Sequence, residues 1–376
     1  MTKGIRKRAG SLRRNLAFGR VALRRSVTAY VGWLGEGNVG DEAMFLAHRQ
    51  LFPELDFVGV PASSSTALTR AAGGLPWLHC QAVCLGGGTL IGNGHFRLAL
   101  ENAVAGWPEA PRFTLGVGVE DPGYREGLRS GVVEELDRWR MLLERFQSVG
   151  VRGPLSQSAL ADLGIQSDVV GDPALALRLP TRPPDDGLLG LNVGTVDDQW
   201  GLDPDAFRRQ AISLARGLLG DGWRILLVPT FSDDVAFQRA LADELGQGVS
   251  VADGPLGVPE VAEQLARCQL VIAHKLHAAV LAAAVEVPAI ALEYRPKCRD
   301  FQESVGRGAF VMRTDQMDEA VVRQWVRETA DDREEHVRDL AEHVERLRER
   351  LATAAAGISR TARAEPRALS PRRRAR

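Results

Sequence analysis

The segment from Leu270 to Lys297 constrains the fold of this chain more than any other part of the sequence. It begins with a short apolar run, Leu270 to Ala273, that predicts a buried strand, and it continues into an alanine-rich helix. A second apolar run predicts another strand that ends near Tyr294. Because a helix between two buried strands is typical of a parallel βαβ unit, the segment predicts an open α/β sheet.

Charged and titratable side chains follow both of these strands. The first strand is followed by His274, Lys275 and His277. The second is followed by Tyr294 and Lys297. Ligands of open α/β sheets bind outside the carboxyl ends of the strands, so we expect an anionic substrate to be held here. Histidines at a strand–helix junction can also be purely structural, and that alternative stays open.

A glycine-rich segment follows the first strong apolar run of the chain. Residues 28–34 predict a strand, the sequence GEGNVGDE covers residues 35–42, and residues 43–51 predict an amphipathic helix. This order formally matches the G-x-G-x-x-G dinucleotide fingerprint, whose glycines let a pyrophosphate approach a helix amino terminus.

The next strand argues against a dinucleotide. The fingerprint needs an acid at the end of that strand, where it would reach a ribose hydroxyl. In residues 55–60 the only acid, Asp56, lies near the start. We therefore expect Asn38 and Asp41 to place polar side chains in a substrate cleft instead.

The other strands of the N-terminal half also end in residues that can bind a ligand or take part in catalysis. One leads into a triple glycine that includes Gly87 and Gly88, whose backbone N–H groups can approach a ligand closely. Without a ligand, the same triplet is a tight turn. Later strands end at Glu120, Arg152 and Asp172.

Taken in order, these motifs resemble the polysaccharide pyruvyl transferase family. The matching segments are GNVGDE (37–42), GGGTL (86–90), VRGPLS (151–156), GDPAL (171–175) and HKLHAAVLAAAVEVPAIALEYRPK (274–297). The resemblance covers roughly Thr28 to Gly306. It implies two facing Rossmann-like doubly wound domains, similar to the glycosyltransferase B arrangement. It also implies transfer of a pyruvyl unit from phosphoenolpyruvate to a pair of sugar hydroxyls, which gives a cyclic ketal.

The resemblance further implies a donor site formed by Arg152, Lys275 and His277. The family usually has arginine where this chain has Lys275. Since arginine grips a carboxylate or phosphate with a planar fork and lysine acts as a point charge, this departure bears on donor affinity and identity. Phosphoenolpyruvate carries two anionic groups, so Lys297 is a further candidate cation.

The chemistry needs an acid for the methylene carbon and a base for the sugar hydroxyl. We expect His277 to be the acid, because imidazole titrates near neutrality. Asp41, Glu120 and Asp172 are the candidates for the base. No clustered carboxylates suggest a metal, and no cofactor is expected beyond the donor substrate. The candidates for substrate binding are Asn38, Gly87, Gly88, His95, Asp172, His274 and Tyr294, of which His95 and Tyr294 can equally be structural.

The length of the chain and a proline-rich segment within it predict the domain organisation. A chain of 376 residues suits two domains, and a segment rich in proline and charge separates two series of alternating strands and helices. The predicted units are a basic N-terminal extension (1–27), an N-terminal Rossmann-like domain (28–178), a linker (179–187), a C-terminal Rossmann-like donor-binding domain (188–312), a C-terminal helix (313–357) and a basic disordered tail (358–376).

Charge is unevenly distributed along the chain, although its net charge is only -1. Residues 1–25 hold nine Lys or Arg and no acid, and residues 360–376 hold seven Arg and one Glu, which leaves a body with a net charge of −16. Such tails are either solubilising ends or attach the protein to an anionic membrane surface. An acidic body opposes wrapping by nucleic acid, so we expect no nucleic-acid partner.

The remaining bulk properties indicate a cytoplasmic enzyme, peripheral at the inner face of the membrane if the tails bind lipid. No run approaches the roughly 20 apolar residues of a spanning helix. The four cysteines lack the paired spacing of a zinc site or a disulfide framework.

The expected partners are phosphoenolpyruvate and a saccharide or lipid-linked saccharide from a cell-envelope or exopolysaccharide precursor. One alternative is a glycosyltransferase of the same architecture that uses a nucleotide sugar, for which Glu293 is the one candidate ribose-binding acid. A second alternative, which rests on the departure at Lys275, is a non-catalytic glycan-binding relative.

Overall fold

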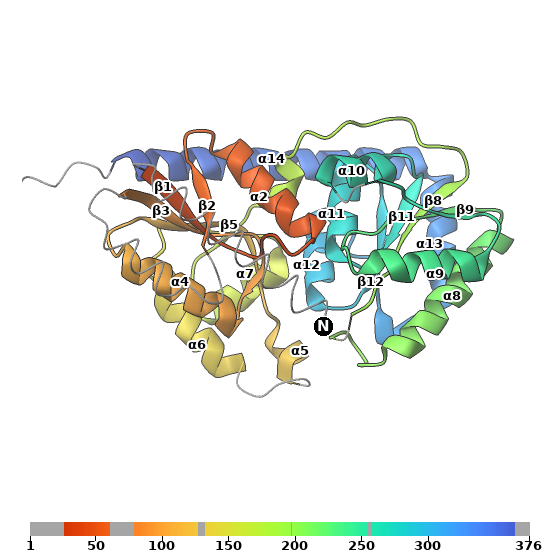
Figure 1. The fold of residues 1–376 in the computed structure, drawn as a ribbon, viewed down its shortest axis with the longest axis horizontal. Helices are drawn as coiled ribbons and strands as arrows, with labels where there is room; N and C mark the ends of the chain where they lie inside the picture. Colours follow the sequence, from red (N-terminus) through yellow and green to blue (C-terminus); the bar gives the residue numbers. More distant parts are fainter. Residues whose placement is uncertain (1–25, 61–78, 127–131, 197, 255–256, 365–376) are drawn as a thin grey trace, which may run out of the picture.

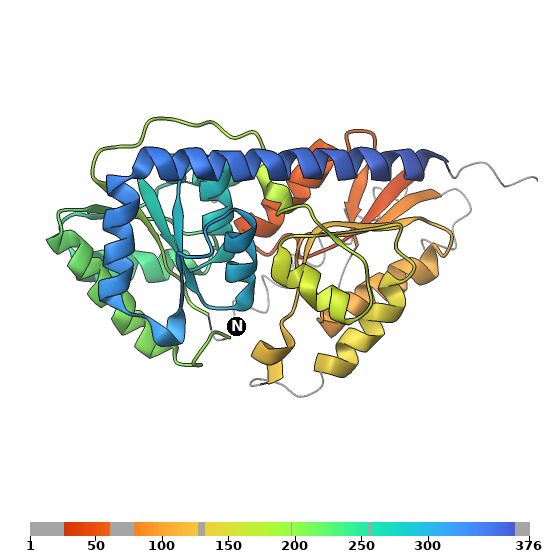
Figure 2. The same cartoon turned by 180° about the vertical axis from the view of Figure 1, so that it is seen from behind.

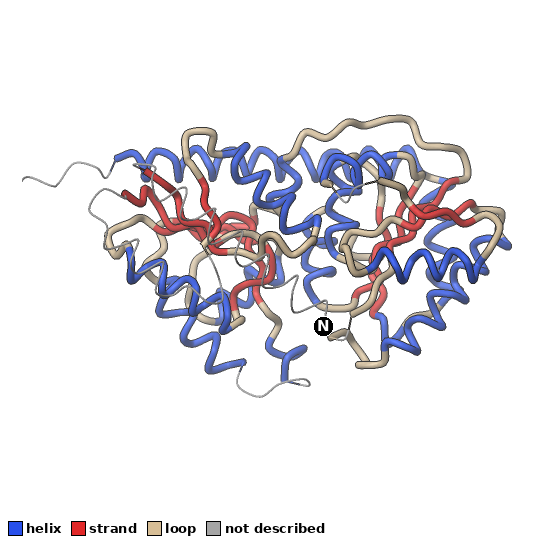
Figure 3. The backbone as a smooth tube through the Cα atoms, viewed as in Figure 1, coloured by secondary structure: helices blue, strands red, loops and turns tan. Residues whose placement is uncertain are grey.

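The computed structural model describes residues 26–60, 79–126, 132–196, 198–254 and 257–364. These residues form two parallel sheets that lie side by side, each flanked by helices (Figure 1). Figure 3 shows the strands of both sheets in red, with helices around them in blue. The predicted fold class of two Rossmann-like α/β units is therefore confirmed.

The first sheet has the strand order β2-β1-β3-β5-β6-β7, with β4 paired to β5. Its strands are β1 (Ser26–Val31), β2 (Phe57–Gly59), β3 (His79–Leu85), β4 (Gly88–Ile91), β5 (Arg112–Val119), β6 (Ser148–Val151) and β7 (Asp168–Val169). Its helical elements are α2 (Val39–Leu51), α4 (Gly94–Gly106), α5 (Pro122–Glu126), α6 (Val132–Leu143), α7 (Pro154–Asp162) and the 3₁₀ turn η1 (Pro173–Ala176). The strand order reverses beside β1, and such a switch point opens a crevice for ligands.

The second sheet has the order β10-β9-β8-β11-β12-β13. Its strands are β8 (Leu188–Asn192), β9 (Arg224–Leu227), β10 (Val249–Val251), β11 (Leu270–Ala273), β12 (Ala289–Glu293) and β13 (Val311–Arg313). Its helical elements are α8 (Pro204–Gly220), α9 (Asp234–Leu245), α10 (Val258–Ala266), α11 (Leu276–Ala284), α12 (Pro296–Ser304), η2 (Thr314–Gln316) and α13 (Glu319–Asp331). Its switch point lies between β8 and β11, where the segment singled out in the sequence begins.

One hydrophobic cluster joins the two halves. Every residue of α11 is buried, because its alanines let it pack closely against η1 and α2 of the first half and against β11 and β12 of the second. The cluster also contains residues of α2 and η1 from the first half, and of α10 and α12 from the second. The two halves are thus packed against each other and share part of their core.

The C-terminal helical segment consists of α13 and then α14 (Arg333–Ala364), which runs along both halves (Figure 2). Its buried stripe follows the 3.6-residue period and consists of Leu340, Val344, Leu347, Leu351, Ala355 and Ile358. Because Ala355 and Ile358 extend this stripe over the first sheet, the helix continues past residue 357, where the sequence suggested its end.

The described residues contain no helix with both the length and the apolar character needed to cross a membrane. Residues 1–25 and 365–376, which carry most of the basic tails, lie outside the described part of the chain. The predicted domain boundaries at 178 and 188 stay predictions, although β8 does begin at Leu188.

Candidate functional site

His277 lies where the two halves meet. It is the second residue of α11, and its ring packs against the first turn of α2, so closely that a Cβ on Gly40 would overlap the imidazole. Its Nε2 atom lies 3.7 Å from Oδ2 of Asp172, which follows β7 in the first half. A glycine at position 40 is therefore a packing requirement of the imidazole.

The surroundings of His277 favour its neutral form. Burial, helped by the cations Lys297 and Arg152, lowers the pKa of His277 to about 3. The carboxyl of Asp172 opposes this, but burial also raises the pKa of Asp172 to about 6. Oδ1 of Asp172 accepts a hydrogen bond of 3.0 Å from the Ala174 N–H, and within the described structure Oδ2 and His277 Nε2 have no hydrogen-bond partner.

Arg152 follows β6 and is completely buried. Its Nη2 atom donates to Thr89 Oγ1 at 3.3 Å and lies 3.4 Å from Oδ2 of Asp300, a residue of α12 in the second half. Its Nε and Nη1 atoms have no hydrogen-bond partner among the described residues. Arg152 thus holds spare donor capacity beside His277 and Asp172.

Lys297 is a second cation near His277, and its charge has no anionic partner among the described residues. It is the second residue of α12, and its Nζ atom lies 4.9 Å from the centre of the Tyr294 ring. In the described part of the chain its Nζ makes no hydrogen bond or ion pair. Burial, together with Arg295 and Arg152, lowers the pKa of Lys297 to about 8. A half-buried ammonium of this kind is ready to receive an anion.

Asp41 contributes a carboxyl from the first turn of α2. Its Oδ2 atom accepts a 2.5 Å hydrogen bond from Asn38 Nδ2, while Asn38 Oδ1 caps the helix at the Gly40 N–H. Burial raises the pKa of Asp41 to about 7, against the opposing effect of Lys297. A carboxyl that titrates near neutrality is suited to acid–base catalysis.

The loop before α2 is tied to the second half by its backbone. The Val39 N–H donates to the Thr230 carbonyl at 3.0 Å, and the Ser232 N–H donates to the Gly37 carbonyl at 3.1 Å. These bonds hold the first turn of α2 beside α11, and with it Asn38.

The side chain of Lys275 makes its polar contacts outside this cluster. Its Nζ atom donates to the Thr195 carbonyl at 3.1 Å and lies 3.8 Å from Oδ1 of the fully buried Asp234. Its backbone N–H donates to Asn192 Oδ1 at 2.8 Å, which anchors the start of α11 to β8. Lys275 is therefore engaged within the second half.

His274 and Tyr294 pack together below the site. The ring of His274 is fully buried, stacks on Phe207 with centres 4.3 Å apart, and meets Tyr294 edge to face at 5.2 Å. Burial lowers the pKa of His274 well below its usual value. The ring of Tyr294 supports Lys297, so it contacts the cluster indirectly.

The triple glycine is needed for close packing. A Cβ on Gly87 would overlap Met44 of α2, and the Gly87 N–H donates to the Tyr30 hydroxyl at 3.3 Å. Gly88 has a φ of +97°, and a Cβ there would lie 3.5 Å from Asp41 Oδ1. Gly88 is thus the member of the triplet nearest to the cluster, and the N–H of Gly87 is already used.

A group that sequence reasoning left unassigned crosses the interface beside Glu120. Arg295 pairs with Asp198 through Nη2, and its Nη1 atom lies 4.0 Å from Glu120 Oε1. The Tyr124 hydroxyl of α5 donates to Asp198 Oδ1 at 2.6 Å. Arg295 could have been predicted from the sequence, because it follows a strand and lies between Tyr294 and Lys297. Nothing in the sequence indicates a role for Tyr124.

Asp300 was also missed, because it lies inside a helix and away from any strand end. Its Oδ1 accepts hydrogen bonds from the backbone N–H groups of Leu155 and Ser156 at 3.0 and 3.1 Å, and its Oδ2 accepts one from Ser156 Oγ at 2.7 Å. It therefore caps α7 of the first half from α12 of the second, as a carboxylate at a helix amino terminus does.

The site thus unites Asp41, Arg152, Asp172, His277 and Lys297, which come from both halves. Among the described residues no group of three or more His, Cys, Asp or Glu could hold a metal ion.

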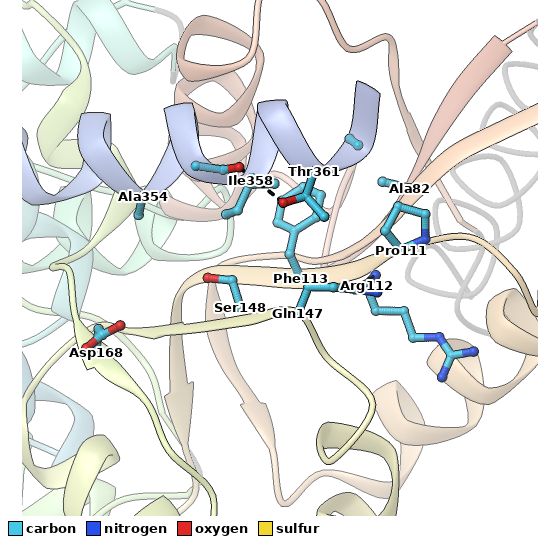
Figure 4. Close-up of a pocket in the computed structure, with 12 residues that line it drawn as sticks. Ala82, Pro111, Arg112, Phe113, Gln147, Ser148, Asp168, Ala354, Ile358 and Thr361 are labelled. Atoms are coloured by element: carbon cyan, nitrogen blue, oxygen red, sulfur yellow. Dashed lines mark hydrogen bonds between the residues drawn. The ribbon is translucent and has the colours of Figure 1, made fainter. Parts of the chain in front are cut away.

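A pocket of about 310 Å³ lies elsewhere, between α14 and the amino ends of β5, β6 and β7 (Figure 4). Its lining includes Arg112, Ser148, Asp168 and Ile358. Substrates of open α/β sheets bind at carboxyl ends, so we do not place the reaction there.

Comparison with protein families matches this chain to a known family. The model of the polysaccharide pyruvyl transferase family matches residues 38–296, a span that includes every residue of the cluster except Lys297. Comparison with curated proteins gives no match.

Solved structures share the fold at low sequence identity. S. aureus MnaA with UDP is 12% identical with a TM-score of 0.60, over 88% of this chain and 94% of that one. UDP-N-acetylglucosamine 2-epimerase from Rickettsia bellii is 11% identical with a TM-score of 0.52, over 89% and 98%. A structure of TarM is 10% identical with a TM-score of 0.42, over 67% of this chain, which spans only 50% of TarM. The two similarities with TM-scores above 0.5 confirm the expected glycosyltransferase B-like arrangement, as a fold.

Proposed function

The chain belongs to the polysaccharide pyruvyl transferase family, and we propose that it transfers a pyruvyl group from phosphoenolpyruvate to two hydroxyls of a saccharide. The product is a cyclic pyruvate ketal. We further propose that the acceptor belongs to a cell-envelope or exopolysaccharide precursor, free or lipid-linked.

The observation that carries this proposal is the uncompensated charge of Lys297 beside Arg152. Phosphoenolpyruvate brings a phosphate and a carboxylate, and each needs a cation or several N–H donors. Lys297 offers an ammonium without an anionic partner in the described structure, and Arg152 offers two unused nitrogens. Two cations with spare capacity in one cluster suit a small dianionic or trianionic donor.

His277 is the proposed acid. Without a bound donor its imidazole is neutral, because burial and then the neighbouring cations lower its pKa. A bound donor would neutralise those cations, raise the pKa of His277 and so charge the imidazole while the donor is present. The imidazolium then gives its proton to the methylene carbon, and C2 becomes electron-deficient.

Asp41 is the proposed base. A sugar hydroxyl adds to C2 and gives its proton to the Asp41 carboxylate, whose pKa of about 7 leaves much of it ionised at neutral pH. Phosphate then leaves with the electron pair of its bond to C2 and with the proton that Asp41 took up. A second hydroxyl adds to C2, gives its proton to the now neutral imidazole of His277, and closes the ring. Glu120, which lies next to Arg295, is the second candidate for the base. Asp172 faces His277, so orienting the imidazole is the role that its position suits.

A nucleotide-sugar donor has less support. The one acid that the sequence offered for a ribose, Glu293, is buried, and its Oε2 atom lies 3.0 Å from Arg299 Nη2. This ion pair leaves Glu293 committed to holding α12 against β12.

The test is turnover in heavy water with phosphoenolpyruvate and a saccharide acceptor. We expect deuterium in the methyl group of the ketal, and phosphate release only when donor and acceptor are both present. His277→Ala is expected to lower the maximal rate by roughly 10²- to 10⁴-fold with a smaller change in donor affinity. Release of a nucleotide from a nucleotide sugar, with no phosphate from phosphoenolpyruvate, would reject the proposal.

A further inference from the structure

Trp33 is an exposed aromatic side chain next to the proposed site. It follows β1 at the carboxyl edge of the first sheet and is 42% exposed. Among the large hydrophobic side chains that are exposed in the described part of the chain, it is the one aromatic residue. An exposed tryptophan at a strand's carboxyl end needs an explanation, because its burial would normally stabilise the fold.

The Trp33 ring has a built support. It lies 6.0 Å from the ring of Phe96, which is buried at the first turn of α4, with an angle of 59° between the planes. The exposed His95 also meets Phe96, edge to face, with ring centres 5.4 Å apart. The position of His95 is fixed because its N–H donates to the Asn93 side chain at 3.0 Å, which caps α4. The buried Phe96 ring thus contacts both an exposed indole and an exposed imidazole.

We call Trp33, His95 and Phe96 the Trp33 platform. Two segments of the chain connect it to the proposed site. Trp33 belongs to the loop that continues into Asn38 and the first turn of α2. On the other side, the turn at Gly92 that leads to His95 packs on Glu120, where a Cβ would lie 2.8 Å from the Glu120 Cβ. Glu120 in turn acts electrostatically on Lys297.

We infer that the Trp33 platform binds the pyranose ring of the acceptor saccharide. The inference rests on the proposed function, since the acceptor must reach the C2 atom of a donor held by Lys297 and Arg152. A pyranose has one face of C–H groups and a rim of hydroxyls. An indole covers such a face, while the exposed His95 nitrogens and the nearby acids match the rim. A hydrophobic protein partner would instead need a wider apolar patch than one indole.

The experiment measures saccharide binding without donor and turnover with donor. Binding is followed by saturation-transfer difference NMR with the methyl glycosides of galactose, glucose, mannose and N-acetylglucosamine. We expect one or more of them to bind the unmodified protein, Trp33→Ala to lose this binding and Trp33→Phe to retain part of it. Leu98→Ala is the matched control, because Leu98 is a 52% exposed residue of the same α4 helix without an aromatic ring. It should bind as the parent does.

In turnover assays we expect Trp33→Ala to raise the KM for the acceptor about tenfold or more and to leave the KM for phosphoenolpyruvate within about twofold. Equal saccharide binding by the parent and Trp33→Ala, or binding of none of the four glycosides by the parent, overturns the inference. Loss of glycoside binding in Trp33→Ala, together with no phosphate release from phosphoenolpyruvate by the parent, would support the platform while rejecting pyruvyl transfer. The two proposals can therefore fail separately.

Discussion

The protonation of His277 depends on a few neighbouring charges. Burial, together with Lys297 and Arg152, favours the neutral imidazole. The Asp172 carboxyl at 3.7 Å favours the charged one. Because the ring is buried, each of these effects is stronger than it would be in water. A ligand that changes the net charge around the ring therefore changes its protonation, and donor binding and proton binding become linked.

The linkage predicts proton uptake on donor binding. At pH 7 the empty site holds His277 neutral, since its pKa is lowered to about 3, and phosphoenolpyruvate raises that pKa. We expect the uptake of up to about one proton per site, and donor affinity should fall as pH rises through the pKa of the liganded imidazole. Calorimetric titration in two buffers of different ionisation enthalpy measures this uptake. His277→Asn should bind the donor with much less uptake, and unchanged uptake in this variant would contradict the role of the imidazole.

The two lysines of the motif are expected to behave differently. Lys297→Met removes a cation that has no anionic partner in the described structure, so it should weaken phosphoenolpyruvate binding by about 2 kcal/mol or more, roughly 30-fold, with little loss of fold stability. Lys275→Met leaves the buried Asp234 carboxylate without its nearest cation and should destabilise the protein by on the order of 3 kcal/mol. Donor titrations and chemical denaturation of both variants measure these effects. A larger loss of donor affinity in Lys275→Met than in Lys297→Met would restore Lys275 as the donor contact that the family resemblance implies.

At the scale of elements, helix amino termini bring the cluster together. The first turns of α2, α11 and α12 supply Asp41, His277 and Lys297, and each helix follows the carboxyl end of a strand. Contacts across the interface fix these termini relative to one another: Val39 bonds to the loop after β9, and Asp300 caps α7. The parallel topology thus brings these three side chains to the carboxyl ends of the strands. The contacts across the interface fix their positions relative to one another.

This close approach of helices predicts the effect of a single methyl group. Gly40→Ala would place a Cβ in the space of the His277 ring, and the displaced imidazole should lower turnover on the order of 10²-fold. Gly220→Ala is the matched control, because a Cβ on this last residue of α8 meets no atom within 4 Å. Steady-state rates of both variants, with circular dichroism to check folding, provide the measurement. Parental turnover by Gly40→Ala would show that the contact has no catalytic importance.

At the scale of the whole molecule, α14 and the shared core bind the two halves into one body. The helix α14 contacts β3 and β5 of the first sheet and the helices α11 and α13 of the second half, and α11 packs against elements of both halves. Charge divides the molecule differently: a body with an excess of acids lies between strongly basic ends. The predicted role of those ends is attraction to an anionic membrane surface.

The basic ends predict salt-sensitive binding to anionic vesicles. Each basic residue near such a surface contributes about 1 kcal/mol, and the attraction is screened as ionic strength rises. At low salt the full chain should therefore sediment with anionic vesicles. A variant without residues 1–25 and 365–376 should stay in the supernatant. The C-terminal deletion begins at residue 365 because α14 continues to Ala364. Neutral vesicles are the control, and binding of the truncated variant to anionic vesicles would contradict the prediction.

Local patterns in the sequence determined the strands, the glycine turns and the polar residues at strand ends, because a buried parallel strand is a continuous apolar run that can be recognised without its neighbours. They also marked five residues as candidates for the site, namely Asp41, Arg152, Asp172, His277 and Lys297. Their direction and pairing could not be predicted in this way. Only the tertiary structure turned Lys275 towards Asp234, set Arg295 against Asp198 and Asp300 against α7, and used the N–H of Gly87 for Tyr30. The reason is that an ion pair or cap between residues 97 or 145 positions apart depends on how distant parts of the chain pack, and no local period records that distance.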